Sequence, residues 1–227
     1  LAADAPPTTQ PAPMDPSAFL LPPPPADSDE AKAEFALLLQ LQQSRTPAQI
    51  ERITAGNSIS MATFTPDVGP WFTEAKLPQL ANLLLRVDLA TNAYNNRLKL
   101  VFMHPRPGDA DPQHLLKPLF NETDPGYPSG HSLRATVYAL LLSRLMPDLK
   151  APLIAHAQQL GFDRVIAGMH YPSDVAAGRT LGAAITQVLL LDPDFQNDFA
   201  AARNELDAAR AAAQTSVAPP ATAPAPH

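Results

Sequence analysis

Three separated segments of the sequence, residues 99–107, 128–131 and 164–174, contain the residue types that displacement at a phosphorus atom requires. Two guanidinium groups and one ammonium group can neutralise the non-bridging oxygens of a phosphoryl group, while a hydroxyl and a backbone N–H add neutral donors. The residues that carry these groups are Lys99, Arg106, Ser129, Gly130 and Arg164. The pattern therefore predicts an oxyanion site assembled from distant parts of one chain.

Two histidines in different segments, His131 and His170, offer groups for nucleophilic attack and proton transfer. A nucleophile attacks phosphorus on one side while an acid protonates the leaving oxygen on the other, so two imidazoles can divide these roles. Asp174, four residues after His170, can fix the tautomer of one histidine and stabilise its charged form. Each residue alone also fits a solvated charge, a structural cap or a metal ligand. A metal is disfavoured because the accompanying residues are cations.

These residues need helices to position them, and the clearest predicted helix begins at Ser129. Pro128 and Gly130 break regular structure just before an apolar run at 133–146, which predicts a long and central helix. Ser129 is a suitable N-cap, and the free N–H groups of a helix N-terminus can hold an anion. His131 would then stand in the first turn, above that anion.

Helical periodicity or capping signals mark the other elements, and no stretch alternates convincingly at period two. We expect an extended strap at 20–25, loops at 57–75 and 105–128, and helices at about 27–43, 46–56, 80–101, 153–164, 174–191 and from 193 onward. The expected caps are Asp27 with Glu30, Thr46 with Gln49, and Ser173. Arg164 continues an apolar stripe, so it should be buried and needs an anionic partner. The expected fold is an all-α, single-domain helical bundle.

Composition bounds the organisation of the chain. Its 227 residues carry a net charge of −6 without a basic block, which excludes an electrostatic case for nucleic acid. The absence of cysteine excludes disulfides and thiolate metal sites. Because Pro, Ala and Thr dominate both ends, we expect disordered tails at 1–19 and 215–227 around a domain at 20–214. The longest apolar segment, 175–191, is short for a membrane span and contains Arg179, so no span is predicted.

Taken together, Lys99…Arg106-Pro107, Pro128-Ser129-Gly130-His131 and Arg164…His170…Asp174 resemble the three-part signature of the type 2 phosphatidic acid phosphatase (PAP2) superfamily. Within it, the chain is more similar to bacterial class A non-specific acid phosphatases, over about residues 20–206. The resemblance implies a helical fold of the PAP2 and vanadium haloperoxidase type. It also implies hydrolysis of many small phosphomonoesters in the periplasm or outside the cell, and a first residue other than Met fits a removed signal peptide.

The resemblance further implies a role for each site residue. His170 would be the nucleophile that forms a phosphohistidine, Asp174 would orient it, and His131 would protonate the leaving alcohol and later activate water. The phosphoryl group would be held by Lys99, Arg106, Ser129, Gly130 and Arg164. No metal or cofactor is implied, although phosphate or vanadate can occupy such a site. Neutral His170 and protonated His131 are needed together, which predicts a working pH near or below neutrality.

Two residues depart from the family pattern. Asp163 stands before Arg164 where serine is usual, and we expect its carboxylate to point away from the pocket. His104, two residues before Arg106, is unusual, and a surface position is expected for it. His114 and His156 receive no role.

Other functions fit part of the pattern. The alternatives are a vanadate-dependent haloperoxidase, a phosphatase that acts on lipid headgroups from solution, and a non-catalytic module whose Pro-rich tails bind a partner. The exposed apolar positions of an all-helical domain make a homodimer plausible.

Overall fold

The computed structural model describes residues 15–217, and these contain helices and loops but no strand. The longer helices are α1 (Asp29–Ser44), α2 (Pro47–Ala55), α4 (Pro78–Phe102), α5 (Gly130–Leu145), α6 (Lys150–Ile166), α7 (Pro172–Leu191) and α8 (Pro193–Val217). The short ones are η1 (Pro16–Phe19), η2 (Met61–Phe64), α3 (Thr65–Val68) and η3 (Pro147–Leu149). The predicted all-α fold is confirmed.

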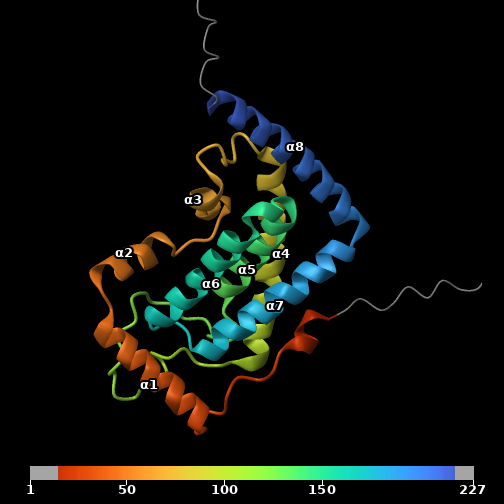
Figure 1. Cartoon of the computed structure of the whole chain (residues 1–227). Coiled ribbons are helices and arrows are strands. Elements are labelled where there is room, and N and C mark those ends of the chain that lie inside the picture. The colour runs from red at the N-terminus through yellow and green to blue at the C-terminus, as the bar shows by residue number, and fades with distance from the viewer. Residues whose placement is uncertain (1–14, 218–227) are drawn as a thin grey trace, which may run out of the picture.

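Helix α5 is the central element, with α4, α6 and α7 packed around it (Figure 1). Its apolar residues face neighbours on nearly every side, and Leu133, Leu141 and Leu142 are completely buried. Burying a leucine side chain contributes about 1.5–3 kcal/mol, so this helix anchors the main core. Ser129 caps it by accepting a hydrogen bond from the backbone N–H of Ser132, as the sequence predicts.

Helices α5 and α7 approach each other closely because α7 has glycine at the contact. A Cβ atom added to Gly178 would lie 2.4 Å from the carbonyl oxygen of Ser129, and one added to Gly182 would lie 2.9 Å from that of Leu133. No larger residue fits there without moving a helix. The contact brings the first turns of the two helices together, and with them two of the three sequence segments.

Several element boundaries differ from the prediction. The first long helix is capped by Ser28, whose hydroxyl accepts from Ala31 N, rather than by Asp27. Residues 57–75 include η2 and α3 and are not entirely loop. Helix α7 begins at Pro172, because proline suits a first helical turn, and Ser173 does not cap it. The predicted capping box of α2, formed by Thr46 with Gln49, is confirmed.

The ends of the domain extend further than predicted. Residues 16–19 form η1, and the Ser17 N–H donates to the hydroxyl of Tyr94 on α4 at 3.1 Å, so this part of the expected tail is ordered. Helix α8 continues to Val217, past the predicted boundary at 214. The other tail residues, 1–14 and 218–227, lie outside the described residues. The strap at 20–25 has no regular structure, and the Tyr127 hydroxyl donates to the carbonyl of Leu21.

Helix α7 is long and apolar enough to cross a membrane by length and composition alone. Its best 18-residue window has a mean hydropathy of 1.2, and 44% of that window is buried within the fold. Core helices of soluble proteins also have these properties. The expectation that the chain lacks a membrane span therefore stays a prediction.

Candidate active site

One cavity of about 150 Å³ brings together most of the predicted site residues. Those that line it are Lys99, Arg106, Gly130, His131, Arg164 and His170. They come from the last turn of α4, the loop after it, the first turn of α5, the last turn of α6 and the loop before α7. Ser129 and Asp174 are completely buried and do not line the cavity. The participation of Ser129 in phosphate binding therefore stays a prediction.

The three basic residues are buried almost completely. Lys99, Arg106 and Arg164 are 5%, 5% and 2% exposed. Burial lowers the pKa of Lys99, and it lowers the pKa of Arg164, because a charged group loses hydration there. Three cations that face a small cavity can be stabilised only by anions in or beside it. Within the described residues Arg164 Nε has no hydrogen-bond partner, so one donor of the site is available to a further acceptor.

His170 is held between an anion and a cation, and this fixes its tautomer. Its Nδ1 lies 3.2 Å from Asp174 Oδ2, and its Nε2 lies 3.2 Å from Arg106 Nη1. A guanidinium can only donate, so Nε2 must accept and therefore carries a lone pair, while Nδ1–H donates to the carboxylate. Burial lowers the pKa of His170, although Asp174 opposes this effect. The ring is therefore neutral, and the lone pair of Nε2 lies on the side of the cations.

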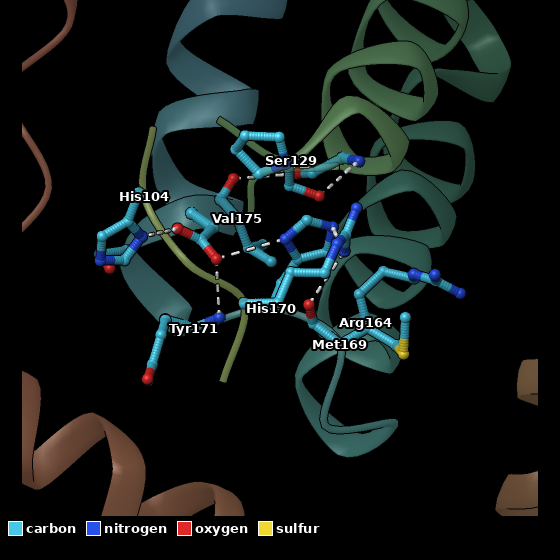
Figure 2. Close-up of polar contacts among 12 residues, drawn as sticks. His104, Ser129, Arg164, Met169, His170, Tyr171 and Val175 are labelled. Carbon is cyan, nitrogen blue, oxygen red and sulfur yellow. Dashed lines mark hydrogen bonds and ion pairs between the residues drawn. The ribbon is translucent and has the colours of Figure 1, made fainter. Parts of the chain in front are cut away.

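Asp174 accepts hydrogen bonds at both carboxylate oxygens. Oδ2 accepts from His170 and from the Tyr171 backbone N–H at 3.0 Å, and Oδ1 lies 3.2 Å from His104 Nδ1. Figure 2 shows His104 and His170 on opposite sides of the carboxylate, joined to it by dashed lines. Burial raises the pKa of Asp174, but hydrogen bonds from His104 and His170 outweigh it and lower the pKa to about 2. The group is therefore an anion throughout the ordinary pH range.

The expected surface position of His104 is wrong. Only 16% of its side chain is exposed, and its ring packs beside those of Tyr127 and Tyr171. Met103, which ends α4 in the left-handed conformation with φ of 48°, turns the chain so that the next side chain points inward. Sequence periodicity contains no signal for this turn, because a non-glycine residue rarely adopts it.

His131 lies in the first turn of α5, on the cavity wall, and is 8% exposed. Burial, together with the nearby charges of Arg164 and Arg134, lowers its pKa to about 3. The ring is therefore neutral at ordinary pH. An anion placed among the cations would raise this pKa and favour the protonated ring.

Asp163 points away from the cavity, as expected. Its carboxylate accepts from Arg52 at 2.7 and 3.0 Å, which joins α6 to α2, and also from Gln159 at 2.8 Å. It does not line the cavity and does not pair with Arg164, whose acidic partner is Glu122 at 2.8 Å. The departure from the family pattern changes a helix contact rather than the charge of the site.

Sequence reasoning missed the other polar residues of the cavity wall, which are Asn57, Asn92, Asn95, Asn96, Glu122, Asp124 and Arg134. The Asn57 side chain accepts from Arg164 Nη1 at 2.8 Å. A Cβ atom on Gly130 would lie 3.0 Å from Asn95 Nδ2, so glycine allows α4 to come close to the start of α5. The only feature of the sequence that pointed to Glu122 and Asp124 was the expectation that a buried Arg164 needs an anionic partner. Among the described residues, no three His, Asp or Glu side chains gather as a metal site would require.

Comparison with known proteins finds related phosphatases. The family model described as PAP2 superfamily matches residues 80–198. The chain is 29% identical over 220 residues to an acid phosphatase of Zymomonas mobilis, a match that covers 88% of this chain and 79% of that one. It is 31% identical over 200 residues to a non-specific acid phosphatase of Salmonella typhi, covering 84% and 80%.

A solved structure shares the fold. It is the transmembrane PAP2 type phosphatidylglycerolphosphate phosphatase of Bacillus subtilis, with a TM-score of 0.55 and 22% identity over 72% of this chain and 86% of that one. The likeness supports the all-α fold.

Proposed function

The chain belongs to the PAP2 superfamily, and from that membership and its cationic cavity we propose that it is an acid phosphatase of broad specificity. In this proposal it hydrolyses phosphomonoesters through a phosphohistidine, without a metal ion, and it acts in the periplasm or outside the cell. The observation that carries the proposal is the placement of His170, whose neutral Nε2 lies beside Arg106 while Asp174 holds its opposite nitrogen.

The first chemical step transfers the phosphoryl group to the protein. His170 Nε2 attacks phosphorus as the bond to the leaving oxygen breaks, and His131 gives its proton to that oxygen. Lys99, Arg106 and Arg164 neutralise the non-bridging oxygens, and Asp174 stabilises the positive charge that develops on the attacking ring. The phosphate itself would prepare His131 for this step, since its negative charge raises a pKa that burial holds at about 3.

The second step releases phosphate. His131, now neutral, takes a proton from a water molecule whose oxygen attacks phosphorus, and the phosphorus–nitrogen bond to His170 breaks. The products are inorganic phosphate and the neutral nucleophile, while His131 has regained its proton. Each group therefore returns to its starting state, and the overall reaction consumes one water.

Hydrolysis of p-nitrophenyl phosphate across pH, with and without EDTA, tests the proposal. We expect activity at and below neutral pH that EDTA does not reduce, and His170→Ala should lower kcat by at least about a thousandfold. His114→Asn, a change of an exposed histidine outside the cavity, is the matched control and should be neutral. A brief quench with labelled substrate should recover an acid-labile phosphoprotein from the wild type and none from His170→Ala.

Three results would contradict parts of this assignment. Activity that is lost with EDTA and restored by a divalent metal would show that the reaction needs a metal ion. Full turnover by His170→Ala would show that the reaction does not pass through a phosphohistidine at residue 170. Halide oxidation by the vanadate-loaded protein, with no ester hydrolysis, would favour a haloperoxidase.

A further inference from the structure

Two carboxylates pair with Lys99, Arg106 and Arg164, the three buried cations of the cavity. Glu122 contacts Arg106 Nη2 at 2.5 Å and Arg164 Nη2 at 2.8 Å, one oxygen to each guanidinium. Asp124 contacts Arg106 Nη2 at 2.8 Å and Lys99 Nζ at 2.7 Å, again with one oxygen to each. Four carboxylate oxygens therefore occupy the donor directions that the proposed function gives to phosphate oxygens.

The two sides of these ion pairs differ strongly in exposure. The side chains of Lys99, Arg106 and Arg164 are 6%, 6% and 3% exposed, whereas those of Glu122 and Asp124 are 35% and 49% exposed. The cations are fixed parts of the wall, and the carboxylates reach them from the solvent side. A carboxylate that leaves such a pair regains hydration, while a buried cation that loses its partner cannot. The acidic side chains are thus the part that can be exchanged for another anion.

The backbone that carries Glu122 and Asp124 is held in place independently of their side chains. The loop is anchored by a hydrogen bond from Leu119 N to Ala167 O and by another from Gly126 N to His104 O. Between these anchors, the Asp124 carbonyl accepts from Arg106 and the Pro125 carbonyl accepts from Lys99, both of which are cavity cations. The acidic side chains can therefore turn outward while both ends of the loop stay in place.

Lys99, Arg106 and Arg164 together form what we call the cation cradle. We propose that Glu122 and Asp124 are internal anions that occupy this cradle between turnovers and compete with the phosphate of the substrate. They thereby set the affinity of the site for phosphate, both as substrate and as product. This inference rests on the proposed function, because it takes the cradle to be the phosphate site. The carboxylates keep the buried cations neutralised and in position, and they weaken the binding of any anion that must displace them.

A purely structural role makes the opposite prediction. If the two carboxylates only hold the cations in a productive arrangement, removing their charge will disorder the cradle and weaken phosphate binding. If they compete with phosphate, removing their charge while keeping their shape will strengthen it. Glu122→Gln and Asp124→Asn make this distinction because the amides are nearly isosteric and cannot neutralise a guanidinium.

The experiment measures the inhibition constant of inorganic phosphate and the KM for p-nitrophenyl phosphate. We expect each single variant to lower both by several-fold, and the double variant to lower both by about tenfold, as suits half-exposed ion pairs. Asp109→Asn is the control, since its exposed carboxylate on the same loop makes no ion pair in the described part of the chain. Calorimetric titration with inorganic phosphate gives the same affinity independently of turnover.

The outcomes separate this inference from the function beneath it. If the wild-type protein neither hydrolyses the ester nor binds phosphate, the proposed function is wrong. Wild-type protein that does both, with variants that bind phosphate equally or more weakly, would overturn the internal-anion inference alone. A variant that is merely misfolded is recognised by circular dichroism, and the other single variant then decides.

Discussion

At the scale of single residues, the site depends on how one buried carboxylate is shared. Asp174 gives one oxygen to His170 and the other to His104, so the second histidine limits how the carboxylate can turn. Removing one donor from a buried carboxylate costs about 1–3 kcal/mol, which is enough to change the orientation of the His170 ring. Under the proposed function, His104 is therefore expected to be a positioning residue that acts through Asp174, and no family pattern points to it.

The matching prediction concerns His104→Ala. We expect kcat for p-nitrophenyl phosphate to fall about tenfold with little change in KM, because the substitution leaves untouched the cations to which the proposed function assigns phosphate binding. The acid limb of the pH profile should move upward, since an Asp174 with one fewer donor raises the pKa of His170 more strongly. His104→Asn, whose amide can donate from nearly the position of Nδ1, should recover most of the rate. An equal loss at every pH, with no rescue by asparagine, would contradict positioning.

At the scale of elements, sequence reasoning succeeds where a local rule governs the structure. Ser129 and Thr46 cap helices because short polar side chains satisfy free N–H groups, and this needs no tertiary information. The central position of α5 follows from apolar residues on all its faces. The loop at 103–129 has no period, so neither the inward turn of His104 nor the reach of Glu122 could be derived. Both are set by which distant groups happen to face the loop.

The glycine contact between α5 and α7 gives a prediction at this scale. Gly178→Ala should lower the free energy of unfolding by about 2–3 kcal/mol, because the added methyl group meets the Ser129 carbonyl at 2.4 Å and must push the helices apart. The same shift moves the first turn of α5 relative to His170, so activity should fall further than the loss of folded protein explains.

Urea unfolding and kinetics on the folded fraction test this prediction. Ala176→Ser, an exposed change on the same helix, is the control and should alter stability by less than about 0.5 kcal/mol. A Gly178→Ala protein with wild-type stability and wild-type kcat would show that the two helices can accommodate the added methyl group without moving apart.

At the scale of the whole molecule, the site and the stability of the fold are coupled through buried ionisable groups. The pKa of His131 falls from an unfolded value near 6.5 to about 3 on folding. The folded protein therefore loses stability as pH falls from about 6.5 toward 3, because the unfolded chain binds the proton first. Asp174, whose pKa is lowered to about 2, has its effect only below about 3.8, so the two groups act in different pH windows.

We expect the free energy of unfolding in urea to drop by about 2 kcal/mol between pH 6.5 and 4.5 from His131 alone, since one pKa unit corresponds to about 1.36 kcal/mol and the unfolded histidine is already half protonated at pH 6.5. His131→Asn should remove that part of the slope, because asparagine does not titrate, whereas exposed His114→Asn should leave the slope unchanged. Inorganic phosphate should protect the wild type more at pH 4.5 than at pH 6.5, as the bound anion favours protonated His131. A slope that is the same in His131→Asn and in the wild type would mean that burial of this ring does not control the acid stability of the molecule.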